Sequence, residues 1–136
     1  MSLVAVFTVG CATTPEGSYE DPYAPARHAV ATYLRYEDVP IPSTFLLIHQ
    51  KSLSVESGSS RIASLHYQGR GNRIEIINFY KEYMPDYGWR LVNLIEGAQT
   101  IMNYSNGGEM CTIVMTGDYH KITLNISLSP EDKPKE

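Results

Sequence analysis

The chain has 136 residues, of which 43% are hydrophobic and 19% are charged. Eleven Lys and Arg residues stand against fifteen Asp and Glu residues, which leaves a net charge of -4. This length suits one domain. The acidic balance argues against nucleic-acid binding, because phosphate contacts need clustered Lys and Arg. No apolar run approaches the roughly 20 residues that a membrane-spanning helix needs.

The N-terminus has the pattern of a secretory signal. A short apolar stretch, residues 3–9, is followed by Gly10 and Cys11 and then by a polar sequence with Pro15. An apolar stretch that ends at a small residue is typical of a signal peptide, and a Cys directly after it resembles the lipobox of bacterial lipoproteins. The resemblance implies cleavage before Cys11 and acylation of its sulfur and its new amino group with fatty acids such as palmitate.

Two positions differ from the usual lipobox, because Thr8 stands where Leu is usual and no Lys or Arg precedes Arg27. The alternative interpretation is a buried N-terminal strand with Cys11 as an ordinary thiol. In the lipoprotein interpretation residues 1–10 are the signal peptide. By resemblance to lipoprotein sorting, Ala12 favours the outer membrane, with the protein facing the periplasm. Several acyl chains together would hold it there, since each buried CH₂ contributes about 0.8 kcal/mol.

Three regions follow the signal. Residues 11–38 are expected to form a Pro-rich tether, with a short helix over residues 26–36, where helix formers are frequent. Prolines within residues 39–42 enforce extended backbone and mark the start of the domain. The domain is expected over residues 39–129, and residues 130–136 form a polar tail.

Within the domain, periodicity predicts a hairpin, one helix and four further strands. Asn72 is a good N-cap, Pro85 and Gly88 end the helix, and Gly-containing turns connect the last strands. The expected elements lie at residues 45–48, 51–56, 61–68, 72–87, 89–96, 99–105, 110–116 and 120–129. The order β-β-α-β-β-β-β predicts an α+β fold. In this fold an antiparallel sheet carries one main amphipathic helix packed on one face.

The end of the helix carries a sequence signature. It consists of Phe79 to Lys81, then Met84-Pro85, then Gly88-Trp89. This signature resembles that of a group of small uncharacterised bacterial lipoproteins with a domain of unknown function. The resemblance covers residues ~39 to ~129 and implies a shared fold, but it implies no activity.

The sequence offers no local motif for catalysis, for a cofactor or for a metal. Its four His residues include no pair at helical spacing, although His66 and His120 are expected on neighbouring strands, and two further ligands would be needed for zinc. Arg70 and Arg73 flank the N-terminus of the helix and are candidates for an anion-binding site with the helix N–H groups. The alternative is a plain turn followed by an N-cap.

Cys111 lies in an apolar strand and is expected to be a buried structural thiol. The chain has ten Tyr residues. Most of these, including Tyr80 on the helix and Tyr104 in a strand, are expected to bury the ring and leave the hydroxyl in water. A tyrosine-lined binding surface is the alternative.

These patterns predict a lipid-anchored envelope protein with a non-enzymatic binding or scaffolding role. Its partners would be the membrane, through Cys11, and an envelope protein. A second hypothesis is a periplasmic module that binds a small ligand in a pocket between helix and sheet. An enzyme is the least favoured, because catalysis needs a positioned base, nucleophile or metal.

Overall fold

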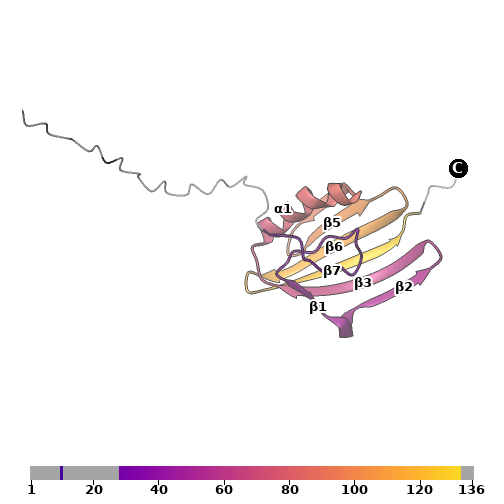
Figure 1. Ribbon diagram of the computed structural model, residues 1–136, viewed down its shortest axis with the longest axis horizontal. Helices are drawn as coiled ribbons and strands as arrows, with labels where there is room; N and C mark the ends of the chain where they lie inside the picture. The colour runs from indigo at the N-terminus through magenta and orange to yellow at the C-terminus, as the bar shows by residue number, and fades with distance from the viewer. Residues whose placement is uncertain (1–9, 11–27, 133–136) are drawn as a thin grey trace, which may run out of the picture.

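The computed structural model of the protein describes residue 10 and residues 28–132. They form a largely antiparallel sheet accompanied by one main helix, which agrees with the expected α+β class (Figure 1). The helix α1 (Arg73–Tyr83) continues into a 3-10 turn, η2 (Met84–Tyr87), and another 3-10 turn, η1 (His49–Lys51), follows the first strand. The strands are β1 (Phe45–Leu47), β2 (Leu53–Ser57), β3 (Ser60–Gly69), β4 (Arg90–Glu96), β5 (Thr100–Ser105), β6 (Glu109–Asp118) and β7 (Lys121–Pro130). None of the described helices is long and apolar enough to cross a membrane.

The strands follow the order β1-β3-β7-β6-β5-β4, and β2 also pairs with β3. β1 pairs with residues 67–69 of β3 and β2 with residues 60–64, so the two short strands form one interrupted edge. At the interruption the Ser52 hydroxyl accepts from the His66 N–H at 3.0 Å and donates to the Ile48 carbonyl at 2.8 Å. This hydroxyl provides hydrogen bonds to the His66 N–H and the Ile48 carbonyl, because η1 interrupts the strand pairing at this point. The structure therefore has three strands before the helix, at the three stretches expected to be extended, whereas the predicted order β-β-α-β-β-β-β counted only two of them.

Local sequence signals set both ends of the helical segment. The Asn72 side chain accepts from the Ile74 N–H at 2.8 Å, as an N-cap does. Pro85 has no N–H to donate, and the chain from Met84 onward takes the 3-10 form of η2. Gly88 then adopts a left-handed φ of 90° and ends the segment. The expected N-cap and glycine stop are confirmed.

A single hydrophobic core joins α1, the segment before β1 and alternate residues of the strands. Ile76, Phe79 and Tyr80 of α1 are fully buried, and Trp89 packs in the same core. The core residues of the sheet follow the two-residue period of a strand. They are Ala63, Leu65 and Tyr67 of β3, Met102 and Tyr104 of β5, Cys111, Ile113 and Met115 of β6, and Ile122, Leu124, Ile126 and Leu128 of β7.

Residues 28–44 contain no helix, so the short helix expected over residues 26–36 is wrong for its described part. The Ala31 N–H donates to the Ile41 carbonyl at 2.8 Å, and a β-bridge joins the same two stretches. This pairing takes the backbone groups that a helix would use. A long-range partner has therefore overridden the local helix preference.

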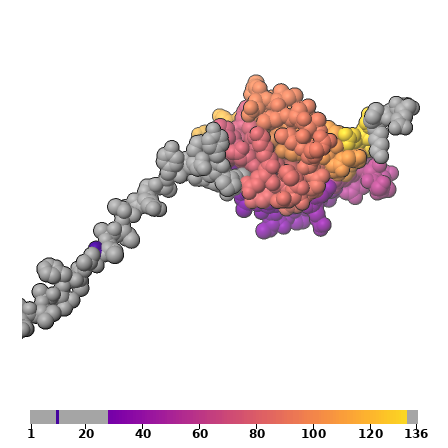
Figure 2. All heavy atoms as spheres, turned by 90° about the horizontal axis from the view of Figure 1, so that it is seen from above, coloured from indigo at the N-terminus to yellow at the C-terminus, as the bar shows by residue number. Residues whose placement is uncertain are grey.

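The same segment belongs to the domain and not to a tether. Tyr36, Val39 and Ile41 are buried in the core. On the molecular surface the segment lies beside the helix (Figure 2). The expected domain start at residue 39 is therefore too late, and packed structure is present from residue 28 onward, because apolar side chains before residue 39 contribute to the core.

A partly buried ion-pair cluster holds the N-terminal segment against the sheet. Arg61 of β3 donates two hydrogen bonds to Asp38 and two to Glu109. The Arg61 guanidinium also lies 4.8 Å from the centroid of the Tyr36 ring, and the Trp89 indole N–H donates to the Asp38 carbonyl at 2.7 Å. The hydrogen bonds to Asp38, and then those to Glu109, raise the pKa of Arg61 above its ordinary value. Arg61 thus joins a strand of the sheet to the segment that precedes β1.

The polar tail expected from residue 130 starts later in the structure. Pro130 is the last residue of β7 and pairs with Glu109. The carboxylate of Glu131 then accepts from the Ser105 hydroxyl at 2.7 Å. The strand is longer than expected because β6 offers a partner along its whole length, while residues 133–136 lie outside the described residues.

Candidate functional site

One face of the sheet carries the side chains that alternate with the core residues and are exposed or half-buried; we call it the open face. Cross-strand partners point to the same side of an antiparallel sheet, so the pairing registers define its members. They are Leu46, Leu53 and Val55 of β1 and β2, Ile62, Ser64, His66 and Gln68 of β3, Thr123, Asn125, Ser127 and Ser129 of β7, Met110, Thr112, Val114 and Thr116 of β6, Ile101 and Asn103 of β5, and Asn93 and Ile95 of β4. The same registers also place Lys121 of β7, Asp118 of β6 and Arg90 of β4 on this side, each at or next to a strand end. The middle rows of the open face contain no Lys, Arg, Asp or Glu, although 19% of the chain is charged.

Hydrogen-bonded polar side chains cross the middle of the open face. The Thr112 hydroxyl donates to the Asn103 side-chain carbonyl at 2.7 Å, and the Asn103 amide donates to the Asn93 side-chain carbonyl at 2.8 Å. On the neighbouring strand pair, the Ser64 hydroxyl donates to the Asn125 side-chain carbonyl at 3.3 Å. These bonds restrict the side-chain rotamers, which reduces the entropy that a partner would have to overcome.

Exposed apolar side chains flank this polar row. Val55 and Ile62 are direct cross-strand partners and are 55% and 60% exposed, and Leu53 beside them is 69% exposed. On the far edge Ile95 is also exposed. Neighbouring exposed apolar groups are a mark of interaction surfaces, so the face combines apolar margins with an uncharged polar centre.

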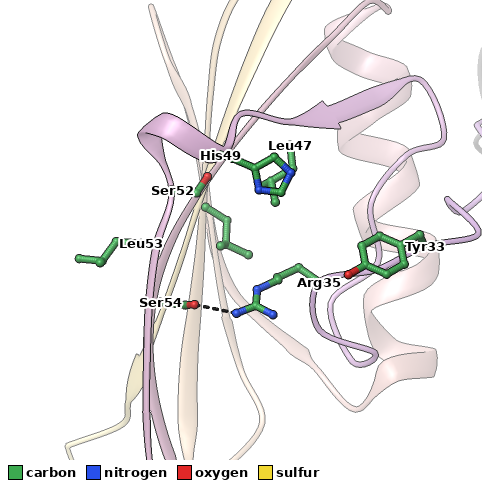
Figure 3. Close-up of a pocket in the computed structure, with 8 residues that line it drawn as sticks. Tyr33, Arg35, Leu47, His49, Ser52, Leu53 and Ser54 are labelled. Carbon is green, nitrogen blue, oxygen red and sulfur yellow. Dashed lines mark hydrogen bonds between the residues drawn. The ribbon is translucent and has the colours of Figure 1, made fainter.

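A cleft lies between residues 29–35 and the interrupted edge of the sheet (Figure 3). It consists of two adjoining cavities, of about 310 Å³ and about 430 Å³, which share Tyr33, Arg35 and Leu47. The larger cavity is lined mainly by apolar side chains, among them Val30, Ile41, Phe45 and Tyr67. The smaller cavity adds the polar side chains of His49, Ser52 and Ser54. The cleft is therefore apolar at one end and polar at the other.

Arg35 lies where the two cavities meet. Its guanidinium points toward Ser54 in Figure 3 and donates to the Ser54 hydroxyl at 2.9 Å. The same group lies 5.4 Å from the centroid of the Tyr36 ring. Burial raises the pKa of Tyr67 to about 12, and the charge of Arg35 opposes that rise, so Arg35 acts electrostatically on the cavity wall. The cleft thus presents one cation and several hydroxyls beside apolar walls.

The two arginines predicted as an anion site lie before and at the start of α1. The Arg73 guanidinium donates to the Gly117 carbonyl at 2.8 Å and to the Gly97 and Ala98 carbonyls at 3.3 Å. It therefore ties the start of the helix to the β4–β5 turn and to the end of β6. Arg70 is exposed. An anion site at these residues stays a prediction, with Arg70 as its more accessible cation.

The described histidines do not converge on one point. His28 pairs with Glu75 of α1 at 3.3 Å, and His66 lies on β3. His120 lies in the turn before β7, so the expectation that it shares neighbouring strands with His66 is wrong. In the part of the chain that the structure describes, no group of three or more His, Cys, Asp or Glu residues could hold a metal ion.

Several polar groups lie deep in the core. The expectation of wet hydroxyls is wrong for Tyr36, Tyr80 and Tyr104, whose hydroxyl oxygens are buried without a hydrogen-bond partner among the described residues. Cys111 is a fully buried free cysteine, as expected. Burial raises the pKa of its thiol to about 12, which suppresses the reactive thiolate.

Comparisons with known proteins assign no family. No protein-family description matches the chain, and no curated protein or solved structure matches it. Cys11 and residues 1–9 lie outside the described residues. The lipoprotein resemblance therefore stays a prediction.

The cleft residues Tyr33, Arg35, His49 and Ser54 were not predicted as site residues from the sequence. They come from a segment predicted to be a tether and from an edge whose interruption was not predicted. One signal was present, because residues 29–34 are largely apolar, and a solvated tether has little need of apolar side chains.

Proposed function

We propose that the protein is a lipid-anchored envelope protein that binds another envelope protein through the open face, without catalysing a reaction. In this proposal Cys11 carries the anchor and holds the protein at the outer membrane, facing the periplasm. Helix α1 and the N-terminal segment cover one side of the sheet and leave the open face to the partner. The observation that carries the proposal is the absence of charge across the middle rows of that face, whose charged side chains lie at strand ends.

Charge depletion is what distinguishes the centre of a protein interface from other surface. A solvated sheet face of this width would be expected to carry Lys and Glu, which also prevent unwanted association. The middle rows of the open face instead carry Ser, Thr, Asn and Gln between apolar margins. Such a mixed surface suits a reversible contact with an uncharged, flat region of a partner.

The distance between anchor and domain is compatible with this role. Residues 12–27 separate Cys11 from His28, and a fully extended chain of this length spans at most about 60 Å. A domain on such a link would meet partners in a thin layer next to the membrane. Local concentration would then compensate for a modest affinity.

The Cys111 thiol is the strongest nucleophile that the sequence offers to catalysis. Its burial and its pKa of about 12 leave very little thiolate at neutral pH. A binding role requires only an accessible surface, and the open face is such a surface. Binding is therefore favoured over turnover.

In-cell photo-crosslinking tests the partner surface. A photoreactive residue at Thr112, in the centre of the open face, should give a discrete crosslinked species. The same residue at Lys81, an exposed position on α1, should give none. Ser127→Lys puts a charge into the open face and should abolish the Thr112 crosslink, while the matched change Lys81→Glu should leave it intact. Equal crosslinking at both positions, or no effect of Ser127→Lys, would contradict the proposal.

Cell fractionation tests the anchor separately. Cys11→Ser removes the acylation site and should move the full-length protein from the membrane to the soluble fraction. If the substituted protein stays as firmly in the membrane fraction as the unsubstituted one, Cys11 does not carry a lipid.

A second candidate function is the binding of a small ligand. The sequence-based hypothesis placed the pocket between the helix and the sheet. In the structure, fully buried side chains such as Phe79 and Met102 fill that region. The cleft beside the interrupted edge is the observation that favours this candidate.

A further inference from the structure

We propose that the cleft binds a single-chain amphiphile with an anionic head. The acyl or alkyl chain would occupy the larger cavity and the head would bind Arg35. The inference rests on the second candidate function and names its ligand. Leu46 and Leu53 lie at the border of the cleft and the open face, but Thr112 at the centre of the open face does not line the cleft.

The larger cavity suits an apolar chain. Its walls include Val30, Ile41, Phe45 and Leu47, with Tyr67 on the sheet side. A cavity of about 430 Å³ falls within the range that small-ligand sites occupy, roughly 300–1,000 Å³. An unbranched chain would remove its own apolar surface and that of the walls from water.

The smaller cavity suits an anionic head. Arg35 supplies a permanent positive charge, while His49 and Ser54 add groups that can donate hydrogen bonds. No Asp or Glu is among the described residues that line either cavity. A carboxylate or a phosphate would therefore meet a cation without a competing acid.

The position of Arg35 joins these two halves. It lines both cavities, and the Ser54 hydroxyl engages one of its five N–H donors. The guanidinium is therefore held at the boundary between the apolar and the polar end. A ligand with its charge at one end and its apolar body at the other matches this arrangement, whereas a uniformly polar molecule would leave the larger cavity unmatched.

Nuclear magnetic resonance titration tests the inference on the full chain with Cys11→Ser, which keeps the protein free of its own lipid. The probes are decanoate and decyl phosphate, each below its critical micelle concentration, and the neutral decanol below its solubility limit. At least one anionic probe should shift backbone signals of residues 29–35 and 45–54. Decanol should bind at least about tenfold more weakly, since hydrogen bonds to charged groups are the strong ones. The tighter of the two anions shows whether the head is a carboxylate or a phosphate.

Substitutions separate the two ends of the cleft. Arg35→Gln should weaken the anionic probe at least about tenfold, and Arg35→Lys should retain most of the affinity because the charge stays. Arg70→Gln is the matched control, because Arg70 is exposed and does not line the cleft. Ala29→Phe fills the larger cavity and should weaken both anions, which provides a second test if Arg35→Gln perturbs the fold.

The inference is overturned if neither anion shifts the cleft signals, if decanol binds as tightly as the anions, or if Arg35→Gln and Ala29→Phe both bind like the unsubstituted chain. None of these results bears on the crosslink at Thr112 or on fractionation of Cys11→Ser. Failure here is therefore distinguishable from failure of the proposed partner surface.

Discussion

Replacing Arg61 by Gln tests how strongly the ion-pair cluster holds the N-terminal segment on the sheet. The Arg61 side chain is 16% exposed, that of Glu109 is 19% exposed and that of Asp38 is 39% exposed. Arg61→Gln removes the charge-assisted hydrogen bonds to both carboxylates. It also leaves Glu109 in a poorly solvated position without its cation.

The expected loss lies between two limits. Breaking a buried ion pair costs about 3–5 kcal/mol, whereas an exposed pair contributes about 0–1 kcal/mol. Glu109 is closer to the first case and Asp38 to the second, so Arg61→Gln should lower the free energy of unfolding by about 3 kcal/mol. For a domain of about 100 residues the entropy of unfolding is about 0.2 kcal/mol per kelvin, so Tm should fall by roughly 15 °C.

Urea denaturation and calorimetry of the full chain with Cys11→Ser measure both quantities. Arg70→Gln is the control and should change stability by less than about 0.5 kcal/mol, as an exposed substitution does. A double-mutant cycle with Glu109→Gln should show coupling of at least about 1 kcal/mol, because the two side chains are in direct contact. A loss below about 1 kcal/mol for Arg61→Gln, or strict additivity in the cycle, would refute the reasoning.

Four further predictions concern the core and a turn. Tyr80→Phe removes a buried hydroxyl that has no hydrogen-bond partner among the described residues; stability in urea should stay equal or rise by about 1 kcal/mol, and a clear loss would reveal a partner. Cys111 should resist a thiol reagent at pH 8 unless the protein is denatured, and rapid labelling of the folded chain would count against its burial. Burial raises the pKa of the Cys111 thiol from 9.0 to about 12, so the folded state favours the protonated thiol. The stability that this thiol contributes should be complete below pH 9 and be lost as pH rises from 9 to 12. Cys111→Ala should remove this pH dependence. Gly117→Ala would place a Cβ 2.1 Å from the Lys121 carbonyl oxygen, at a residue with a φ of 97°. It should lower the free energy of unfolding by more than about 3 kcal/mol, whereas Gly58→Ala, with open space around its Cβ, should lower it by about 1–2 kcal/mol. Equal losses in the two variants would contradict the clash.

The helix and the long strands could be predicted because short-range signals define them. Asn72 caps the helix through a bond to a residue two positions away, and Gly88 ends it through its own backbone conformation. In β7 the alternation of Ile122 and Leu124 with polar neighbours predicts which side chains are buried. Each of these features depends on residues within a few positions of one another.

The first part of the domain could not be predicted in the same way. Residues 28–36 favour a helix locally, yet their backbone pairs with residues around Ile41. The interruption at η1 is stable because the Ser52 hydroxyl reaches the backbone of His66 on another strand. A local sequence pattern does not predict a hydrogen-bond partner that becomes available only after the chain has folded back.

The two candidate surfaces, the open face and the cleft, also depend on contacts between residues that are distant in the sequence. Composition and periodicity by themselves determined that the chain builds one α+β domain with a buried thiol at Cys111 and defined helix ends. Only the tertiary structure decided that uncharged side chains from separate strands form one face, because cross-strand register selects which residues become neighbours. It also decided the cleft, since Arg35 meets Ser54 across 19 positions of the chain and Arg61 meets Glu109 across 48. Contacts of that separation depend on how the whole chain packs, and a local pattern of residue types does not specify them.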